Sequence, residues 1–225
     1  MSKQDDSEVG RSQSAAIKAD IADRCRQLYD RGLIVAGDGN LSVRLNEGVV
    51  LVTPTGVEKG RLQPEDVIEV TLDGDLTSAH RLKPSSEFAM HRACYEERPD
   101  VRAIVHAHPP HAVALSLVEP FDEQPYLSEV ALTLGKVPIL PYCVPTTSAI
   151  ADQVRPAAGD HDAFVLARHG AVALGRTLDE AFGRLETLEH AAKILWLAKQ
   201  AGSPIPLNMS ELAELEKIRK RMNEG

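Results

Sequence analysis

Short apolar runs that end at turn residues recur along this chain, and they constrain its fold more than any other feature. Val49–Val52 is one such run, and Ala163–Leu166 and Ala171–Leu174 flank a short turn. The Asp73-Gly74 pair, with apolar residues on both sides, is a strong hairpin signal. Segments with helical spacing separate these hairpins, without the regular strand–helix–strand repeat of a doubly wound sheet. The sequence therefore predicts a central, mostly antiparallel sheet covered by helices.

The helices are predicted from apolar residues at helical spacing and from the residues that begin or end them. Gly32 ends the first helix and Pro99 ends the second. Residues 1–13 are predicted to be a disordered tail and residues 14–225 to form one domain, since a chain of this length can bury roughly 70% of its unfolded surface. The predicted helices span residues 14–31, 87–97, 111–117, 147–154, 178–200 and 210–221.

Charge and cysteine content limit the classes of protein to which this chain can belong. The formal net charge of -8 argues against binding to nucleic acid or to an anionic membrane surface. No apolar stretch approaches the ~18 residues that a membrane span needs, and the first residues are polar and acidic. Cys25, Cys94 and Cys143 are widely spaced and include no C-x-x-C pair, as is typical of reduced thiols. We therefore expect a cytoplasmic protein.

Three histidines are the strongest candidates for metal ligands. His106 and His108 end an apolar run, and a strand directs residues i and i+2 to the same face. His169 follows another apolar run. Three imidazole ligands with an open fourth position are typical of a catalytic zinc site, if folding brings the three together. The alternative for the first pair is two histidines that only end a strand.

Glu87 is the candidate for acid–base chemistry. It begins a predicted helix behind Pro84-Ser85-Ser86, where the helix dipole favours a negative group. The functional interpretation is a carboxylate placed near the metal as a general base. The alternative is a capping or first-turn acid without a catalytic role, which the spacing also allows.

Three further segments carry small residues, free amides or hydroxyls at a turn or a helix start. They are Gly37-Asp38-Gly39-Asn40, Thr55-Gly56 and Ser85-Ser86. Such places can hold a phosphate without a lysine, although each of them alone could be an ordinary turn. The first segment lacks the full G-x-G-x-x-G pattern, so a dinucleotide site is not expected.

At these residues the chain resembles the class II aldolase/adducin family, typified by L-fuculose-phosphate aldolase. The resemblance runs from about residue 15 to residue 200 and implies a three-layer αβα sandwich of the α/β (α+β) class. The chain departs from the aldolases at Gly37-Asp38, where they often carry threonine, and in the segment 126–129. The motifs that carry the resemblance are Gly39–Ser42, Thr53–Gly56, Pro84–Glu87, His91, Tyr95, Arg98–Asp100, His106–His108 and His169-Gly170.

The resemblance also implies roles for particular residues. It implies a zinc ion, or another divalent transition metal, held by His106, His108 and His169, with Glu87 as the catalytic acid/base. Family members are commonly homotetramers whose active sites lie between subunits, and a tyrosine from the adjacent subunit donates a proton in the aldolases. Tyr126 is the nearest match for this tyrosine, and its alternative role is that of an interface residue. The resemblance implies that the substrate phosphate is bound by Asn40, Thr55, Gly56, Ser85 and Ser86.

The activity that follows is metal-dependent aldol cleavage of a phosphorylated ketose. The products would be dihydroxyacetone phosphate and an aldehyde, formed through a zinc-stabilised enediolate without a lysine Schiff base. A sugar-phosphate epimerase is an alternative, although family epimerases tend to carry Asp where this chain has Glu87. A decarboxylase or a dehydratase of the same family is also possible. A non-enzymatic, adducin-like assembly module is less expected, because all three histidines and Glu87 are present.

Overall fold

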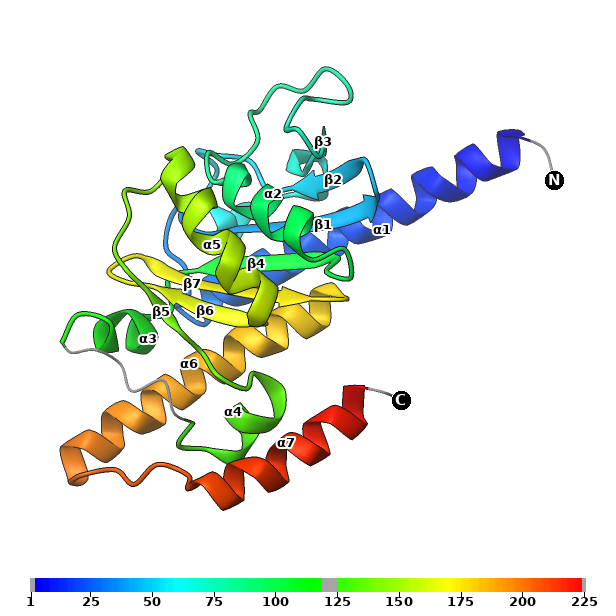
Figure 1. Ribbon diagram of the computed structural model, residues 1–225. Helices are drawn as coiled ribbons and strands as arrows, with labels where there is room; N and C mark the ends of the chain where they lie inside the picture. The colour runs from blue at the N-terminus through cyan, green and yellow to red at the C-terminus, as the bar shows by residue number, and fades with distance from the viewer. Residues whose placement is uncertain (1–2, 119–124, 224–225) are drawn as a thin grey trace.

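A seven-stranded sheet forms the centre of the computed structural model, which describes residues 3–118 and 125–223 (Figure 1). The strand order is β3-β2-β1-β4-β7-β6-β5, and each described pair of neighbours is antiparallel except β5 and β6, which are parallel. The predicted α/β class with a mostly antiparallel sheet is confirmed. The strands span Asn40–Asn46 (β1), Val49–Val52 (β2), Ile68–Thr71 (β3), Ala103–Ala107 (β4), Ile139–Leu140 (β5), Ala163–Leu166 (β6) and Gly170–Gly175 (β7).

Helices cover both faces of the sheet and complete a three-layer αβα sandwich. In Figure 1, α2 and α5 pack together on one face, whereas α1 and α6 lie across the other. No helix within the described ranges is long and apolar enough to cross a lipid bilayer. The helices span Lys3–Asp30 (α1), Phe88–Glu97 (α2), Pro110–Leu115 (α3), Ser128–Thr133 (α4), Ser148–Asp160 (α5), Leu178–Ala201 (α6) and Met209–Asn223 (α7), and 3-10 turns lie at Lys59–Arg61 and Pro64–Asp66.

The central strands are buried on both faces because each face carries its own hydrophobic core. In β4, Val105 packs into the core beneath α1 and α6, whereas Ile104 packs into the core beneath α2 and α5. In β6, Val165 and Phe164 divide in the same way. Alternate residues of a strand point to opposite faces, so strands covered on both sides become continuous apolar runs in the sequence.

The structure differs from the sequence prediction at three helices. Residues 3–13 continue α1, where a disordered tail is predicted; extending a helix costs less than nucleating one, and this stretch has no proline. The α5 helix continues through Pro156 to Asp160, because Ala157 and Ala158 are buried against the α2 side of the sheet. The α4 helix lies in a stretch where no helix is predicted.

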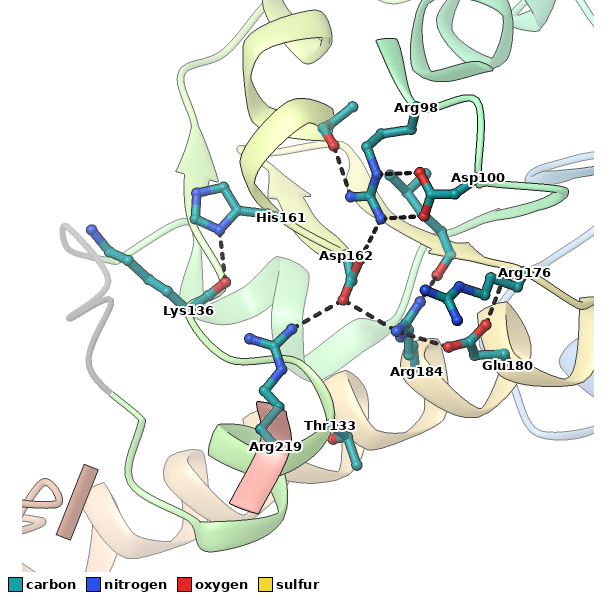
Figure 2. A network of polar contacts seen from close by, with 12 residues as sticks. Arg98, Asp100, Thr133, Lys136, His161, Asp162, Arg176, Glu180, Arg184 and Arg219 are labelled. Carbon is teal, nitrogen blue, oxygen red and sulfur yellow. Dashed lines mark hydrogen bonds and ion pairs between the residues drawn. The ribbon is translucent and has the colours of Figure 1, made fainter. Parts of the chain in front are cut away.

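A buried aspartate fixes two helices to one end of the sheet (Figure 2). Asp162, directly before β6, is 8% exposed, and its carboxylate accepts hydrogen bonds or ion pairs from three arginines. The nitrogen–oxygen distances are 3.2 Å to Arg98, 3.1 Å to Arg184 and 3.0 Å to Arg219. Arg184 belongs to α6 and Arg219 to α7, so this network anchors both helices beside β6.

Candidate active site

The structure brings the three predicted histidines together. His106 lies in β4, His108 follows directly after it, and the antiparallel β6–β7 hairpin carries His169 to the same place. The ring centroids are 4.9 to 5.1 Å apart, and one nitrogen from each ring lies within 4.8 Å of the other two. Side chains far apart in the sequence thus form a group that could bind a metal ion.

The orientation of His106 suits a metal ligand. Its ring is fully buried, and Nδ1 donates a hydrogen bond to the carbonyl oxygen of Ala171 at 2.9 Å. Nδ1 therefore carries a proton, and Nε2 faces the other two rings. Nε2 of His108 lies 3.3 Å from this nitrogen. Burial, with His106 and His169 adding to it, lowers the pKa of His108 to about 4, which keeps this ring in its neutral, ligating form.

Glu87 points into the histidine cluster. It occupies the N-cap position of α2, yet its carboxylate makes no capping hydrogen bond to the described helix, which argues against the capping interpretation. Oε2 lies 3.3 Å from Nε2 of His106, and Oε1 lies 3.2 Å from Nε2 of His169. Burial alone would raise the pKa of Glu87, but the two imidazoles hold it well below its usual range. The carboxylate thus contacts two of the three rings.

The donor set fits a divalent transition metal. Three imidazoles surround one carboxylate, and Oε1 of Glu87 is buried without a hydrogen-bond partner among the described residues. Imidazole nitrogens suit zinc and its neighbours in the first transition row, whereas calcium and magnesium prefer all-oxygen sites.

Asn40 lies beside Glu87, with both ends of its amide in use. It is the first residue of β1 and stands opposite His106 in the β1–β4 register. Nδ2 donates to Oε2 of Glu87 at 2.8 Å, and Oδ1 lies 2.5 Å from Nε2 of His91. Burial, followed by the nearby His106, lowers the pKa of His91 to about 3, so its imidazole is neutral. Both ends of the Asn40 amide are therefore occupied within the protein, by Glu87 and by His91.

The other predicted phosphate-binding segments lie side by side. The amide of Thr55 donates to the carbonyl of Lys83 at 3.1 Å, and the amide of Ser85 donates to the carbonyl of Thr53 at 3.1 Å. Thr55, Gly56 and Ser86 are exposed, whereas Ser85 is buried and its Oγ accepts from the amide of Glu87 at 3.2 Å. An exposed rim of hydroxyl and amide groups therefore adjoins Glu87.

A buried lysine that sequence reasoning missed joins two of these segments. Lys59 is 1% exposed, and its Nζ donates to the carbonyl oxygens of Gly37 at 2.9 Å, Val57 at 3.0 Å and Pro54 at 3.2 Å. Burial lowers its pKa. Lys59 thus ties the glycine turn before β1 to the Thr53–Gly56 loop, although nothing in its sequence context distinguishes it from a surface lysine.

Gly170 is required by the close packing of the histidine rings. A Cβ atom at this position would lie 2.4 Å from the carbonyl oxygen of Ala107 and within 3.0 Å of ring atoms of His108 and His106. Distances this short are sterically forbidden, so glycine is needed for β7 to approach β4 at the cluster. The His169-Gly170 motif therefore has a steric basis.

Comparison with known proteins adds to this geometry. A family model described as the class II aldolase and adducin N-terminal domain matches residues 19–196. The chain belongs to the class II aldolase/adducin family. This assignment confirms the family resemblance of the sequence motifs.

Relatives of this family member carry out different reactions. A 3-oxo-tetronate 4-phosphate decarboxylase from Escherichia coli O6:H1 is 38% identical over 192 residues, which cover 83% of this chain and 89% of that protein. An L-fuculose phosphate aldolase from Methanococcus vannielii is 36% identical over 170 residues, covering 76% of this chain and 90% of that protein. A solved L-fuculose 1-phosphate aldolase aligns with a TM-score of 0.83 at 30% identity, covering 92% of this chain and 96% of that chain. Membership of the family therefore supports a lyase without selecting the bond that is cleaved.

Two residues near the family motifs have surroundings that the sequence did not predict. Tyr126, the candidate shared tyrosine, is half-buried and packs on the core of its own chain, where it lines an apolar pocket with Leu134 and Leu188. Glu189 of α6 is buried, and its carboxylate accepts from the amide and the ring of His111. It caps α3, so His111 does not join the three-histidine cluster.

Proposed function

We propose that this family member is a metal-dependent lyase that decarboxylates a phosphorylated 3-oxo sugar acid. The observation that carries the proposal is the carboxylate of Glu87, held between the imidazoles of His106 and His169. The 38% identity to a decarboxylase of a 3-oxo-tetronate phosphate supports this substrate class. Aldol cleavage of a phosphorylated ketose is the second candidate, favoured by the 36% identity to an aldolase.

The two reactions share their second half. Loss of carbon dioxide from a 3-oxo-tetronate 4-phosphate breaks the C1–C2 bond and leaves its electron pair on C2, conjugated with the C3 carbonyl. Aldol cleavage of a ketose 1-phosphate breaks the C3–C4 bond and leaves the pair on C3, conjugated with the C2 carbonyl. Protonation of that carbon gives dihydroxyacetone phosphate in both cases. One site can therefore support either reaction.

The two candidate reactions differ in the step that breaks the carbon–carbon bond. Aldol cleavage needs a group that accepts the hydroxyl proton of the departing aldehyde, and Tyr126 is the candidate for that group. Decarboxylation needs no such group, because carbon dioxide leaves without a proton transfer. Tyr126 packs on the core of its own chain, so aldol cleavage would require it to reach the site of an adjacent subunit.

Each residue of the cluster has a role in this proposal. His106, His108 and His169 would hold the metal ion, with zinc proposed because three nitrogen ligands and an open position suit it. When bound, the ion would act as a Lewis acid toward negative charge that develops on the substrate oxygens. Glu87 takes up a proton from solvent and passes it to the carbon from which the leaving group departs, so that it returns to the carboxylate form after each turnover. Asn40 holds Oε2 of Glu87 by its 2.8 Å hydrogen bond, which leaves Oε1 to carry that proton.

The rim next to Glu87 is the proposed phosphate site. Thr55, Gly56, Ser85 and Ser86 offer hydroxyl and amide donors to the substrate phosphate. We also propose a homotetramer with active sites between subunits, which native mass spectrometry would test. Exposed apolar side chains such as Trp196 and Leu197 on α6 are consistent with contacts between subunits.

The test is a comparison of two substrates with the metal-loaded protein. Release of triose phosphate reports both reactions, whereas release of carbon dioxide reports decarboxylation alone. We expect 3-oxo-tetronate 4-phosphate to yield both products, at a higher kcat/KM than L-fuculose 1-phosphate yields triose phosphate. Turnover of the ketose phosphate alone would favour the second candidate, and turnover of neither compound would refute the proposed substrate classes.

A further inference from the structure

Five buried polar residues form a row between α2 and β1 that begins at Glu87, and we call this row the file. Its members are Glu87, Asn40, His91, Ser42 and Tyr95. Glu87, His91 and Tyr95 stand four residues apart, which places them on the same side of α2. Asn40 and Ser42 stand two residues apart in β1 and share one face of the strand. Neither His91 nor Ser42 has any exposed surface, and Tyr95 and Asn40 are 1% and 3% exposed. Water therefore does not compete for their hydrogen bonds.

The hydrogen bonds connect these five residues without a gap. Beyond the two bonds of Asn40, Nδ1 of His91 lies 2.7 Å from Oγ of Ser42. Oγ of Ser42 in turn lies 2.8 Å from the phenolic oxygen of Tyr95. The guanidinium of Arg44 stacks 4.6 Å from the centre of the Tyr95 ring and donates to the Tyr95 carbonyl oxygen, which holds the far end of the file in place.

The orientation of the Asn40 amide sets the direction of the other bonds in the file. Its Nδ2 donates to Glu87 and its carbonyl oxygen faces His91. Nε2 of His91 must then carry the ring proton, and Nδ1 must accept from the hydroxyl of Ser42. Oγ of Ser42 is left to accept from the hydroxyl of Tyr95. All donors therefore point toward Glu87.

We propose that His91, Ser42 and Tyr95 are positioning residues that fix the amide orientation of Asn40 and, through it, the carboxylate of Glu87. If the amide were reversed, its carbonyl oxygen would face the carboxylate, and two acceptors would meet in a buried site. The file makes this reversal costly, because the His91 tautomer and the Ser42 hydroxyl would have to reverse with it. The assignment rests on the proposed role of Glu87 in proton transfer.

In this proposal Asn40 positions the carboxylate of Glu87 and does not bind the substrate phosphate. A residue that binds phosphate changes KM when it is disturbed, whereas a residue that aims the proton-carrying carboxylate changes kcat. A purely structural polar network would change stability and neither kinetic constant. The three roles can therefore be told apart by experiment.

The first test is the tautomer of His91 in the metal-free protein, read from the ¹⁵N chemical shifts of its ring. Protonated and unprotonated imidazole nitrogens give well-separated shifts, so the measurement needs neither metal nor substrate. We expect a proton on Nε2 and none on Nδ1, and we expect Ser42→Ala to admit the other tautomer. A proton on Nδ1 in the unchanged protein would overturn the proposal.

The second test compares two substitutions of His91. A glutamine places an amide nitrogen near the position of Nε2 and can still donate to Asn40, whereas an asparagine is too short to do so. We expect His91→Asn to lower kcat about 10- to 100-fold at unchanged KM, and His91→Gln to restore most of the loss. His161→Asn is the matched control and should keep full activity, because His161, whose Nδ1 lies 3.1 Å from the Lys136 carbonyl oxygen, lies outside the file.

The outcomes distinguish this proposal from the proposed function. Equal losses in the two His91 variants, or a change in KM alone, would overturn the positioning role. An unchanged protein with the expected tautomer but no lyase activity would refute the proposed function and leave the directed file intact. If His91→Asn fails to fold, the tautomer measurement and His91→Gln still decide the question.

Discussion

Two buried carboxylates, Glu87 and Asp162, stand in opposite electrostatic surroundings. Both are 8% exposed. Asp162 is surrounded by Arg98, Arg184 and Arg219, which are permanently charged, and each of them reaches one of its oxygens (Figure 2). Glu87 instead faces imidazoles, and its Oε1 has no hydrogen-bond partner within the described chain.

The partners of a buried carboxylate indicate whether it stabilises the fold or is available for chemistry. A fully paired buried charge holds elements together, and removing one partner is costly. A buried charge with an unused oxygen costs stability, and such atoms concentrate at functional sites. Burial alone does not distinguish Glu87 from Asp162, but the partners around each carboxylate do.

The largest effect is expected when the Glu87 surroundings lose a ligand. His106→Ala should abolish metal binding and activity together, because the remaining two imidazoles no longer define a three-ligand site. Metal content by plasma mass spectrometry and turnover on the same sample would check this. Asp162→Asn serves as the control and should keep its metal. Full metal occupancy in His106→Ala would show that His106 is not a ligand.

Glu87→Gln should keep the metal and lower kcat by about 10² to 10⁴, the range for loss of a general acid–base group. The amide has nearly the same shape, so the fold and the three imidazoles stay in place. Steady-state kinetics with a parallel thermal melt would separate a loss of turnover from a loss of structure. A Glu87→Gln protein with normal turnover would remove the proton-transfer role.

Asp162→Asn should have the reverse signature, with activity retained and stability lost. The substitution leaves three arginines without their shared counter-charge, and about 3 kcal/mol is expected for breaking a buried ion pair of this kind. Urea unfolding at neutral pH would measure the free energy of unfolding. An unchanged midpoint would mean that the arginine cluster around Asp162 contributes nothing to the fold.

Arg219→Ala removes one of the three arginines around Asp162 and should have the smallest effect on stability. It removes a single charged hydrogen bond of 3.0 Å from α7, with an expected loss of about 1.5 kcal/mol. Hydrogen exchange should increase in α7 while α6 stays protected through Arg184. If both helices exchanged faster, Arg219 would be holding more than α7.

The sequence predicted the elements of the site because its signals are local. His106 and His108 share a face through the period of a strand, and Glu87 and His91 share a face through the period of a helix. Val49–Val52 and the hairpin from β6 to β7 follow from apolar runs and turn residues. These features depend on residues that are close together in the sequence, so the sequence alone shows them.

The remaining features depend on contacts between distant segments. Glu189 caps α3 from 77 residues away along the chain, so its pattern within α6 resembles that of a solvated acid. Lys59 is buried by three carbonyl groups that only the folded loops bring together. Asn40 was predicted to bind phosphate, and only the arrangement of β1 against α2 reveals its bond to Glu87.

Proton exchange into dihydroxyacetone phosphate tests whether the metal and Glu87 act together in proton transfer. The metal-loaded protein would be incubated with dihydroxyacetone phosphate in D₂O, and the hydroxymethyl protons would be followed by NMR. We expect one proton of this group to be replaced by deuterium, and we expect exchange to stop when a chelator removes the metal or when Glu87 is replaced by Gln. Exchange no faster than with the metal-free protein, or equally fast in the Glu87→Gln protein, would contradict it.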